Sequence, residues 1–310
     1  MSVVVITYNS SKYILECLDS IYNQTYQNIE LIITDDCSKD DTVEICRQWL
    51  ERHSDRFIQT KQITTTINTG VPSNLNRGIR DCSGDWIKPF AGDDMLMPDA
   101  IDNYVNIVNN DIDVVVGLSQ QFYKEGGDYI FNQIISPNSA MDFFFEGDAT
   151  FQYKMFHRVS FVIGPCFFIR KTVFDKIGLY DERYPYFEDI PFIYKLLRAK
   201  MKMYKLNKVC VLYRINQKSL THGNKHNFYN IGLEECSFRF RQENVNKDIK
   251  WWDIIYWQSW WIRRIQYHTI VHLANNRINK FTIYISILFN KLNLGKYRQN
   301  ITFWYYNRKC

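Results

Sequence analysis

The sequence predicts an α/β fold in which a mostly parallel sheet carries helices on both faces. Short apolar runs such as Val3–Ile6, Ile29–Ile33 and Trp86–Phe90 are typical of strands buried on both sides. Longer segments with apolar residues at helical spacing separate these runs, and this β-α-β order implies parallel strands. Polar and acidic residues follow several of the strands, where an open α/β sheet forms its ligand crevice.

Strands and helices alternate through the first third of the chain. Strands are predicted at residues 3–6, 29–33, 57–62, 86–90 and 113–118, and helices from about 11, from about 41, at 72–81 and at 98–109. Ser10 or Ser11 suits the N-cap of the first helix, and acidic residues in the first turn of the second suit its dipole. Pro72 and Pro98 fit the first turns of the other two helices.

This alternation is lost over residues 119–160, which are aromatic and broken by Gly126-Gly127 and Pro137. We expect irregular hairpins there, with a loop that shapes the substrate site. The pattern then predicts a strand at 161–170, a helix at 188–199, a strand pair at 203–213 and helices beyond about 228. An α/β domain over residues 1–225 and a helical region over residues 226–310 are therefore expected.

The net charge of +5 is distributed unevenly. From Lys247 onwards the chain has eleven Lys or Arg against two acids, Asp248 and Asp253, and it holds six of the eight Trp. Such an end is typical of a surface that meets anionic lipid or phosphate, or of a helical cap with a solvated basic face. A homodimer interface is a further use for the same aromatic residues. Nucleic acid is not an expected partner.

The eight cysteines form no CxxC pair and lack zinc-finger spacing, so reduced thiols are expected. The apolar run Val3–Ile6 reads as a strand and is too short for a signal peptide. No window of about 18 uninterrupted apolar residues predicts a spanning helix. We expect a cytoplasmic protein, peripheral on the inner face of the cell membrane if its basic end binds lipid.

Two adjacent carboxylates, Asp93 and Asp94, follow the strand at 86–90, after Gly92. Like charges at the end of a buried strand are hard to desolvate, and a divalent cation removes that difficulty. Carboxylate oxygens suit Mn²⁺ or Mg²⁺, which also take phosphate oxygens and water. The pair indicates either a metal that bridges to a diphosphate, or a helix cap with one acid in solvent.

A second acidic pair, Asp35 and Asp36, follows the strand at 29–33. A carboxylate there can accept the imide N–H of uracil or a ribose hydroxyl, or it can cap the next helix. Tyr8 ends the first strand and offers a flat face for a base, unless it packs in the core.

The third acidic pair is Glu188-Asp189, at the predicted start of a helix. One of these carboxylates can act as general base toward an attacking hydroxyl, or cap the helix. The sequence contains no GxGxxG after its first strand, no GxxxxGK[ST] and no GxSxG. Dinucleotide binding, P-loop ATPase chemistry and serine hydrolase chemistry are therefore not expected.

Three stretches of the chain resemble glycosyltransferase family 2, whose members have the GT-A fold. The stretches are VVVITYNSSKYILECLDSIYNQTYQNIELIITDDCSKDDT, NTGVPSNLNRGIRDCSGDWIKPFAGDDMLMPDAI and FFIRKTVFDKIGLYDERYPYFEDIPFIYKLLRAKMKM. Together they place the similarity at residues 2 to 215, and the combination is highly specific.

The resemblance implies a donor site in the first of these stretches. Tyr8 would stack on the base, with Thr7 and Asn9 in the same loop. Asp36, with or without Asp35, would hold the uracil or the ribose.

The resemblance also implies the reaction. Gly92, Asp93 and Asp94 match the end of the family's DxD motif, which binds Mn²⁺ or Mg²⁺ and the diphosphate. Asp189 matches the catalytic base of an inverting enzyme. That base takes the proton of the acceptor hydroxyl, which attacks the anomeric carbon while nucleoside diphosphate leaves.

Two positions depart from the family pattern. Ala91 stands where the family often has the first Asp of the motif, so the acidic pair alone must suffice. His222 is either a third metal ligand or a surface residue. Leu75 stands where many relatives carry Arg, and the following Asn76 and Arg77 are the candidates for contact with the donor. Arg77 either reaches the donor or lies in solvent on the surface of the helix.

The resemblance implies an inverting transferase that moves a hexose or N-acetylhexosamine from a nucleotide-sugar, by analogy a UDP-sugar, to a saccharide. The segment Trp251 to Arg264 favours a lipid-linked acceptor in the synthesis of O-antigen, capsule or lipooligosaccharide. A nucleotide-sugar-binding protein without turnover is the alternative that Ala91 leaves open. A nucleotidyltransferase is disfavoured because the loop after the first strand contains no glycine.

Overall fold

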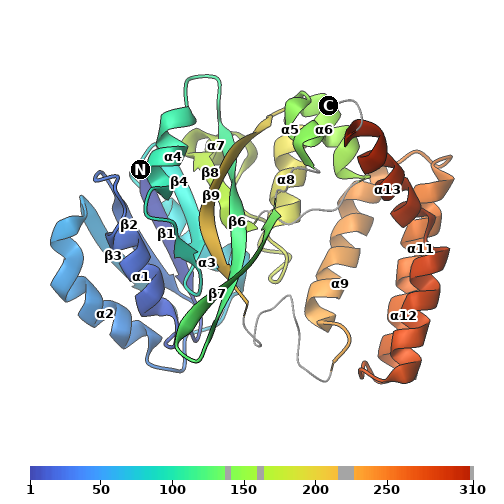
Figure 1. Cartoon of the computed structure of the whole chain (residues 1–310), viewed down its shortest axis with the longest axis horizontal. Coiled ribbons are helices and arrows are strands. Elements are labelled where there is room, and N and C mark those ends of the chain that lie inside the picture. Colours follow the sequence, from blue (N-terminus) through green and yellow to red (C-terminus); the bar gives the residue numbers. More distant parts are fainter. Residues whose placement is uncertain (137–140, 159–163, 216–226, 308–310) are drawn as a thin grey trace. The chain divides into compact units, whose positions relative to one another are not determined.

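The computed structural model of the chain describes residues 1–136, 141–158, 164–215 and 227–307. The chain divides into two compact units (Figure 1). The sheet unit comprises residues 1–153 and 161–215, and the helical unit comprises residues 154–160 and 216–310. The domain boundary at residue 225 falls outside the described residues and stays a prediction.

The sheet unit is built on nine strands in the order β3-β2-β1-β4-β8-β6-β9-β5, with β7 paired to β6. Their bounds are β1 Ser2–Thr7, β2 Glu30–Asp35, β3 Gln59–Thr64, β4 Trp86–Ala91, β5 Met95–Leu96, β6 Val114–Glu125, β7 Asp128–Ser136, β8 Phe167–Arg170 and β9 Met203–Arg214. The four strands β3, β2, β1 and β4 run parallel to one another, as the alternating pattern predicts.

The position of each parallel strand within the sheet follows from how apolar its sequence is. In β1 and β2 almost every side chain is buried, because helices cover both faces of the sheet there. The polar sequence of β3 suits an outermost strand, and its side chains are exposed or half-buried.

The other half of the sheet changes direction. β8 runs antiparallel between β4 and β6, whereas β9 runs parallel to β6. Gly126 and Gly127 have φ values of 60° and 102° and join β6 to β7 in one long hairpin. The strand pair predicted at 203–213 is wrong, because this segment forms the single strand β9 alongside β6.

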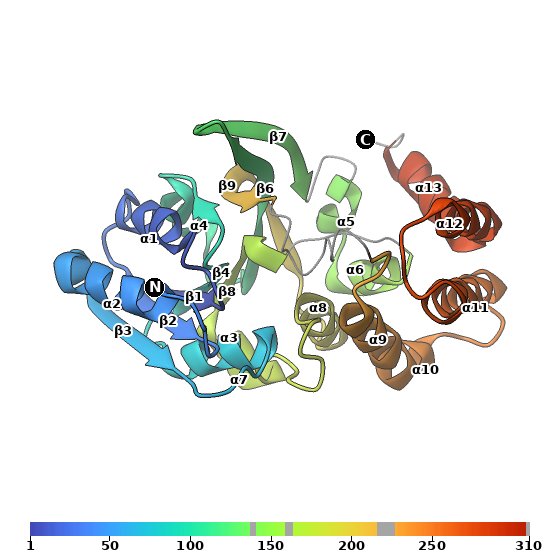
Figure 2. The same ribbon diagram turned by 90° about the horizontal axis from the view of Figure 1, so that it is seen from below.

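Helices cover both faces of the sheet, with α1 and α4 on one face and α3 and α7 on the other (Figure 2). The helices from residue 14 to residue 198 are α1 Ile14–Tyr22, α2 Thr42–His53, α3 Val71–Arg80, α4 Ala100–Ile107, α5 Asp142–Glu146, α6 Ala149–Phe156, α7 Lys171–Ile177 and α8 Asp189–Arg198. Neither Ser10 nor Ser11 caps α1. Instead the carbonyl of Ser10 accepts from Tyr13 N and Ile14 N at 2.8 and 2.9 Å, in a turn before the helix.

The described part of the helical unit contains α9 Ile231–Phe240, a π-helical segment at Arg241–Val245, α10 Asn246–Asp248, α11 Ile254–His268, a π-helical segment at Thr269–Leu273, α12 Lys280–Leu292 and α13 Leu294–Asn307. Asp253 caps α11 by accepting from Tyr256 N at 3.0 Å, and Asn279 and Thr282 form a capping box on α12. Within the described part of the chain, none of the helices combines the length and the apolar character needed to cross a membrane.

Candidate active site

The carboxyl ends of three neighbouring parallel strands meet at one edge of the sheet. Thr7 of β1 is in register with Asp35 of β2, and the preceding Ile6 is in register with Ala91 of β4. Beyond the strands, Asp36 N donates to Thr7 O at 3.0 Å and Gly92 N donates to Ile6 O at 2.9 Å. The edge therefore brings together the turn after β1 and the acidic pairs after β2 and β4.

Asp35 shapes the loops at this edge. Its carboxylate is buried and accepts from Thr7 Oγ1 at 2.8 Å, from Ser38 N at 2.8 Å and from Ser38 Oγ at 2.5 Å. The Ser38 hydroxyl also accepts from Asn9 N at 2.8 Å. Between these anchored residues the ring of Tyr8 is 48% exposed, so it does not pack in the core and is open to a ligand.

Asp36 is held by four hydrogen-bond donors of the protein. Its Oδ1 accepts from Thr69 Oγ1 at 2.7 Å and from Arg77 Nη2 at 2.8 Å, and its Oδ2 accepts from Thr69 N at 2.8 Å and Gly70 N at 2.7 Å. Since a carboxylate offers about four lone-pair sites, a base or ribose that reaches Asp36 must replace one of these donors. Arg77 thus lies directly at the acidic pair, as a candidate for contact with the donor.

Gly92 is required by the close approach of two strands. A Cβ at this position would lie 2.8 Å from Thr7 Cγ2 and 3.1 Å from both Ile14 Cδ1 and Ile6 O. These atoms belong to the buried packing of β1 and α1, so a larger residue would displace the acidic loop that follows.

Protein groups compensate the charge of the Asp93-Asp94 pair less fully than that of Asp36. Asp94 is 2% exposed, and its Oδ1 accepts from the backbone N of Arg214 at 2.8 Å. Burial raises the pKa of Asp94 well above its usual value, and the neighbouring charge of Asp93 raises it further. The pair therefore fits a divalent cation, which would take its remaining ligands from phosphate and water.

Arg214, the last residue of β9, is a site residue that sequence reasoning missed. Its Nε donates to Asp93 O at 2.6 Å and its Nη2 to Glu16 Oε2 at 2.6 Å, while its guanidinium lies 4.7 Å from the ring of Tyr13 and 4.4 Å from that of Phe122. The side chain is 3% exposed. The signal in the sequence was an arginine that ends a mainly apolar strand, but nothing in that pattern names its partner.

No group of three or more His, Cys, Asp or Glu side chains suited to a metal occurs among residues 1–136, 141–158, 164–215 and 227–307. A site for Mn²⁺ or Mg²⁺ at Asp93 and Asp94 would therefore depend on ligands from a bound diphosphate. His222 lies outside the described residues.

The third acidic pair begins α8. Burial raises the pKa of Glu188 to about 8, and the charge of Asp189 contributes to that rise. Burial also raises the pKa of Asp189, whose Oδ1 accepts from Ile190 N at 2.7 Å. Glu188 occupies the N-cap position without a hydrogen bond from its side chain to the helix. A half-buried pair with raised pKa values suits a group that takes a proton near neutral pH.

Three contacts attach the segment that carries Asp189 to the rest of the site. Asn76 of α3 donates to Tyr180 O and accepts from Tyr180 N, both at 2.9 Å, and Val71 N donates to Pro185 O at 3.1 Å. Asn76 is 1% exposed and its amide is fully used here, so the structure does not bring it to the acidic pairs. It positions the segment before Asp189 instead.

A buried lysine supports the same region from the middle of β4. Lys88 Nζ is fully enclosed and donates to Pro165 O at 2.5 Å. Burial lowers the pKa of Lys88 to about 8. In the same turn, a Cβ on Gly164 would lie 3.6 Å from Asp189 Oδ2. Lys88 thus links the strand that leads to Asp93 with the turn beside Asp189.

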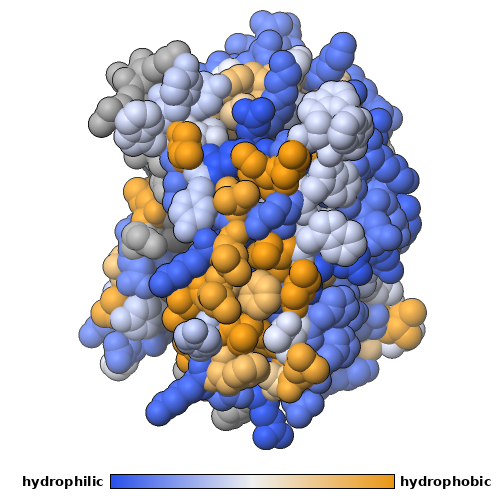
Figure 3. Space-filling view, turned by 90° about the vertical axis from the view of Figure 1, so that its right-hand side faces the viewer, coloured by the Kyte–Doolittle hydropathy of each residue, from blue (hydrophilic) through white to orange (hydrophobic). Residues whose placement is uncertain are grey.

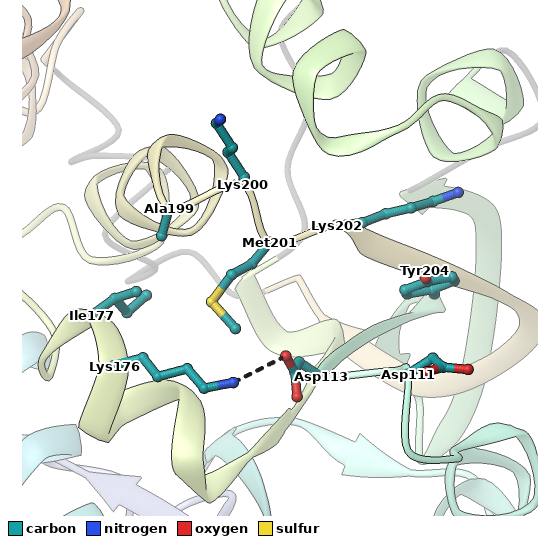
Figure 4. Close-up of a pocket in the computed structure, with 9 residues that line it drawn as sticks. All are labelled: Asp111, Asp113, Lys176, Ile177, Ala199, Lys200, Met201, Lys202 and Tyr204. Atoms are coloured by element: carbon teal, nitrogen blue, oxygen red, sulfur yellow. Dashed lines mark ion pairs between the residues drawn. The ribbon is translucent and has the colours of Figure 1, made fainter.

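A cavity of about 370 Å³ lies elsewhere in the sheet unit (Figure 4). Its lining includes Asp111 and Asp113, before β6, and Lys200 to Lys202, before β9. Lys176 points toward Asp113, with Nζ 3.7 Å from Oδ2. Because β6 and β9 run parallel to β1, this cavity lies at the opposite edge of the sheet from the acidic pairs.

The chain matches known glycosyltransferases. The family described as glycosyl transferase family 2 matches residues 2–178. The glycosyltransferase GlyG of Streptococcus pneumoniae is 27% identical over 229 residues, which cover 71% of this chain and 72% of that protein. An uncharacterized glycosyltransferase of Rickettsia typhi is 27% identical over 231 residues, covering 71% of this chain but 65% of that protein. The chondroitin synthase of Escherichia coli is 39% identical over 103 residues, 33% of this chain and 14% of that protein.

Solved structures share the fold at low sequence identity. TarS of S. aureus in complex with UDP-GlcNAc has a TM-score of 0.54 at 16% identity, over 96% of this chain and 87% of that chain. GalNAc-T7 with UDP, GalNAc and Mn²⁺ has a TM-score of 0.55 at 14% identity, over 86% of this chain and 50% of that chain. The predicted GT-A fold, the helical C-terminal region and the class of enzyme are confirmed at this level. Since the family match covers more than half of the chain, the protein belongs to glycosyltransferase family 2.

Proposed function

We propose that this chain is an inverting glycosyltransferase that moves a hexose or N-acetylhexosamine from a UDP-sugar to a saccharide acceptor. The observation that carries the proposal is the acidic pair of half-buried Asp93 and buried Asp94, at the same sheet edge as Tyr8 and Asp36. UDP and UDP-GlcNAc are the ligands named for solved TarS structures, and UDP with Mn²⁺ for GalNAc-T7. These ligands support a uridine donor for this chain.

The donor would lie across the carboxyl ends of β1, β2 and β4. The exposed ring of Tyr8 supplies a stacking face, and the polar edge of the base or ribose meets Asp36. Arg77 Nη2 is the donor to Asp36 that belongs to a long side chain rather than to the adjoining loop. It can turn from Asp36 toward the ligand without unfolding the backbone at Thr69 and Gly70.

Asp93 and Asp94 would hold Mn²⁺ or Mg²⁺, with the diphosphate completing the coordination. The bound metal would offset negative charge that grows on the departing nucleoside diphosphate. Arg214 fixes the loop for this task, since its backbone N–H orients Asp94 and its Nε holds the carbonyl of Asp93.

Asp189 would take the proton of the acceptor hydroxyl as that hydroxyl attacks the anomeric carbon. The burial that raises the pKa of Asp189 also makes its carboxylate a stronger base. Attack from the face opposite the departing diphosphate inverts the anomeric centre.

The acceptor is proposed to be a lipid-linked saccharide of a bacterial surface polysaccharide, met at the inner face of the membrane. The polysaccharide enzyme among the relatives, chondroitin synthase of Escherichia coli, supports a saccharide acceptor. The basic, Trp-rich segment Trp251 to Arg264 supports the lipid. A homodimer through the same aromatic residues is the competing use of that segment.

A binding protein without turnover is the second candidate, favoured by Ala91. With alanine at this position one carboxylate of the family motif is missing. Such a protein would bind UDP with Mn²⁺ and transfer nothing.

The two candidates are separated by measuring nucleoside diphosphate released from a panel of nucleotide-sugars with Mn²⁺, Mg²⁺ or EDTA, with water as acceptor. Slow hydrolysis of one donor, lost with EDTA and in Asp93→Asn, would establish a metal-dependent transferase. Asp111→Asn, in the cavity at the opposite edge, is the matched control and should hydrolyse like wild type. Calorimetric binding of UDP with Mn²⁺ but no turnover with any donor or saccharide would favour the binding protein.

A further inference from the structure

Helix α12 exposes most of its large apolar residues, while Ile285 and Phe289 are half-buried. Its sequence is KFTIYISILFNKL, and Thr282 is the buried residue of the helix. Six large apolar side chains on it are between 39% and 65% exposed, namely Phe281, Ile283, Tyr284, Ile287, Leu288 and Leu292. An apolar helix in a folded unit normally faces a core, and exposed apolar side chains that gather on one surface are typical of a site of interaction.

The neighbouring helices extend the uncovered surface. Both α12 and α13 pack against α11. On α13 the exposed residues Tyr297, Ile301, Trp304 and Tyr305 recur at helical spacing, and on α11 so do Trp261 and Ile265. Figure 3 shows the apolar side chains gathered in a strip over the face of the molecule where these helices lie. We call the exposed side chains of α12 and α13 the apolar face.

Cations predominate around the apolar face, and Asp253, just before α11, is paired with Arg298 of α13 at 2.7 Å. The sequence from Ile254 to the end contains no Asp or Glu and nine Lys or Arg. Arg277 and Lys280 are exposed at the start of α12, and Lys291 and Lys296 are exposed at its end and just beyond. Cations therefore stand at both ends of the uncovered helix.

We propose that the apolar face docks in the interface of an anionic lipid bilayer, with α12 lying parallel to the membrane plane. A second copy of the chain that paired through the same face would bring these cations together without an acid to offset them. Anionic lipid headgroups supply the missing negative charge, each cation near such a surface contributing measurably to binding.

The dimensions and side chains of the helix suit this orientation. With 13 residues α12 is about 20 Å long, whereas a spanning helix needs about 20 residues. A short helix with one apolar side buries that side to a depth of about 5–10 Å at the headgroup boundary. Trp304 and the nearby tyrosines are the residue types that prefer this boundary.

This inference deepens the proposed function, since it names the membrane partner of the region assigned to a lipid-linked acceptor. It depends on the proposed function only for that purpose. The surface can be tested without any transfer reaction.

The test is flotation of the full chain with vesicles of phosphatidylcholine alone and with vesicles that also contain phosphatidylglycerol. We expect binding to the anionic vesicles that weakens as salt is added. Ile287→Glu should lower the partition coefficient by about tenfold or more, because it places a charge on the apolar face. Lys280→Gln should lower it by about fivefold with anionic vesicles.

Ile58→Glu is the matched control, because Ile58 is 68% exposed and lies on the sheet unit. This variant should bind vesicles like wild type. Equal binding by Ile287→Glu and wild type would overturn the proposal. The proposal would also be overturned if wild type does not bind anionic vesicles but sediments as a dimer, and if Ile287→Glu dissociates that dimer.

Donor hydrolysis separates this inference from the proposed function. It is assayed without vesicles, in wild type and in Ile287→Glu. If hydrolysis is absent in wild type while flotation persists, the docking surface stands and the transferase fails. If wild type hydrolyses a donor but does not float with anionic vesicles, the proposed transferase stands and the membrane-docking proposal fails.

Discussion

Two acidic pairs stand at the same edge of the sheet and differ in what balances their charge. Asp35 and Asp36 are surrounded by protein donors, three on the first and four on the second. Asp94, by contrast, accepts one backbone N–H from Arg214 and keeps a raised pKa. The Asp-Asp dipeptide is therefore saturated by protein donors at one strand end, whereas at the next it leaves a buried carboxylate with a raised pKa, which is the pair proposed to hold the cation.

The largest expected effect comes from removing the charge that a metal would need. Asp93→Asn should lower transfer by about 1000-fold, because the departing diphosphate loses its metal-based stabilisation. The rate of nucleoside diphosphate release against Mn²⁺ concentration measures this. Wild-type rates in Asp93→Asn at saturating donor would show that the pair does not hold the metal.

Stability distinguishes the pairs directly. Asp36→Asn should lower the free energy of unfolding by about 3 kcal/mol, because Arg77 loses a buried partner and the loop at Thr69 and Gly70 is released. Asp94→Asn should leave stability equal or higher without metal, since it removes a buried charge and its side-chain carbonyl can still accept from Arg214 N. Urea unfolding of both variants with EDTA measures the difference, and equal losses in the two would refute the contrast.

The Glu188-Asp189 pair extends the comparison to a residue whose loss should affect transfer but not binding of the donor. Asp189→Asn should reduce transfer by about 100-fold, the usual scale for a general base, while UDP and Mn²⁺ still bind with wild-type affinity. Calorimetry alongside the transfer assay measures both quantities. Transfer near the wild-type rate would show that Asp189 is not the base, and lost UDP binding would assign it to the donor site.

The smallest expected effect is on the pH dependence of stability. The pKa of Asp94 is raised in the folded chain, so above its unfolded value of 3.8 the unfolded state releases a proton that the folded state keeps. Stability that is present below that value is therefore lost as pH rises toward the folded pKa. Urea unfolding between acidic and neutral pH should show this loss in wild type, and Asp94→Asn should show less of it. Identical profiles would contradict the raised pKa.

The central strands of the parallel half were predictable, because β1 and β2 each carry a local apolar signal. Val3 to Val5 and Leu31 to Ile33 are apolar runs that no solvated element would contain. The antiparallel half was harder to predict: within the run predicted as a strand, the described residues Gly164–Cys166 form a 3-10 turn and Phe167–Arg170 form β8. In β9, Lys205 to Lys208 looks like a turn between two strands, yet pairing with β6 continues on both sides of it with shifted register.

The acidic loops were predictable as a group, whereas their partners were not. A strand end followed by acids locates the ligand edge without any knowledge of tertiary contacts. Arg214 lies 120 residues from Asp94 in the sequence, and no local pattern relates the two. Asn76 and Arg77 are adjacent in the sequence, but α3 turns them to different neighbours.

That divergence on α3 has a consequence for how specificity changes in this protein. Arg77 grips the loop after β2 while Asn76 grips the segment that leads to Asp189. Helix α3 therefore connects the loop proposed to hold the sugar donor with the segment that leads to the proposed base. If those two assignments hold, a substitution that shifts α3 would change the distance between the donor and the attacking group, and a compensating change around Tyr180 would restore it.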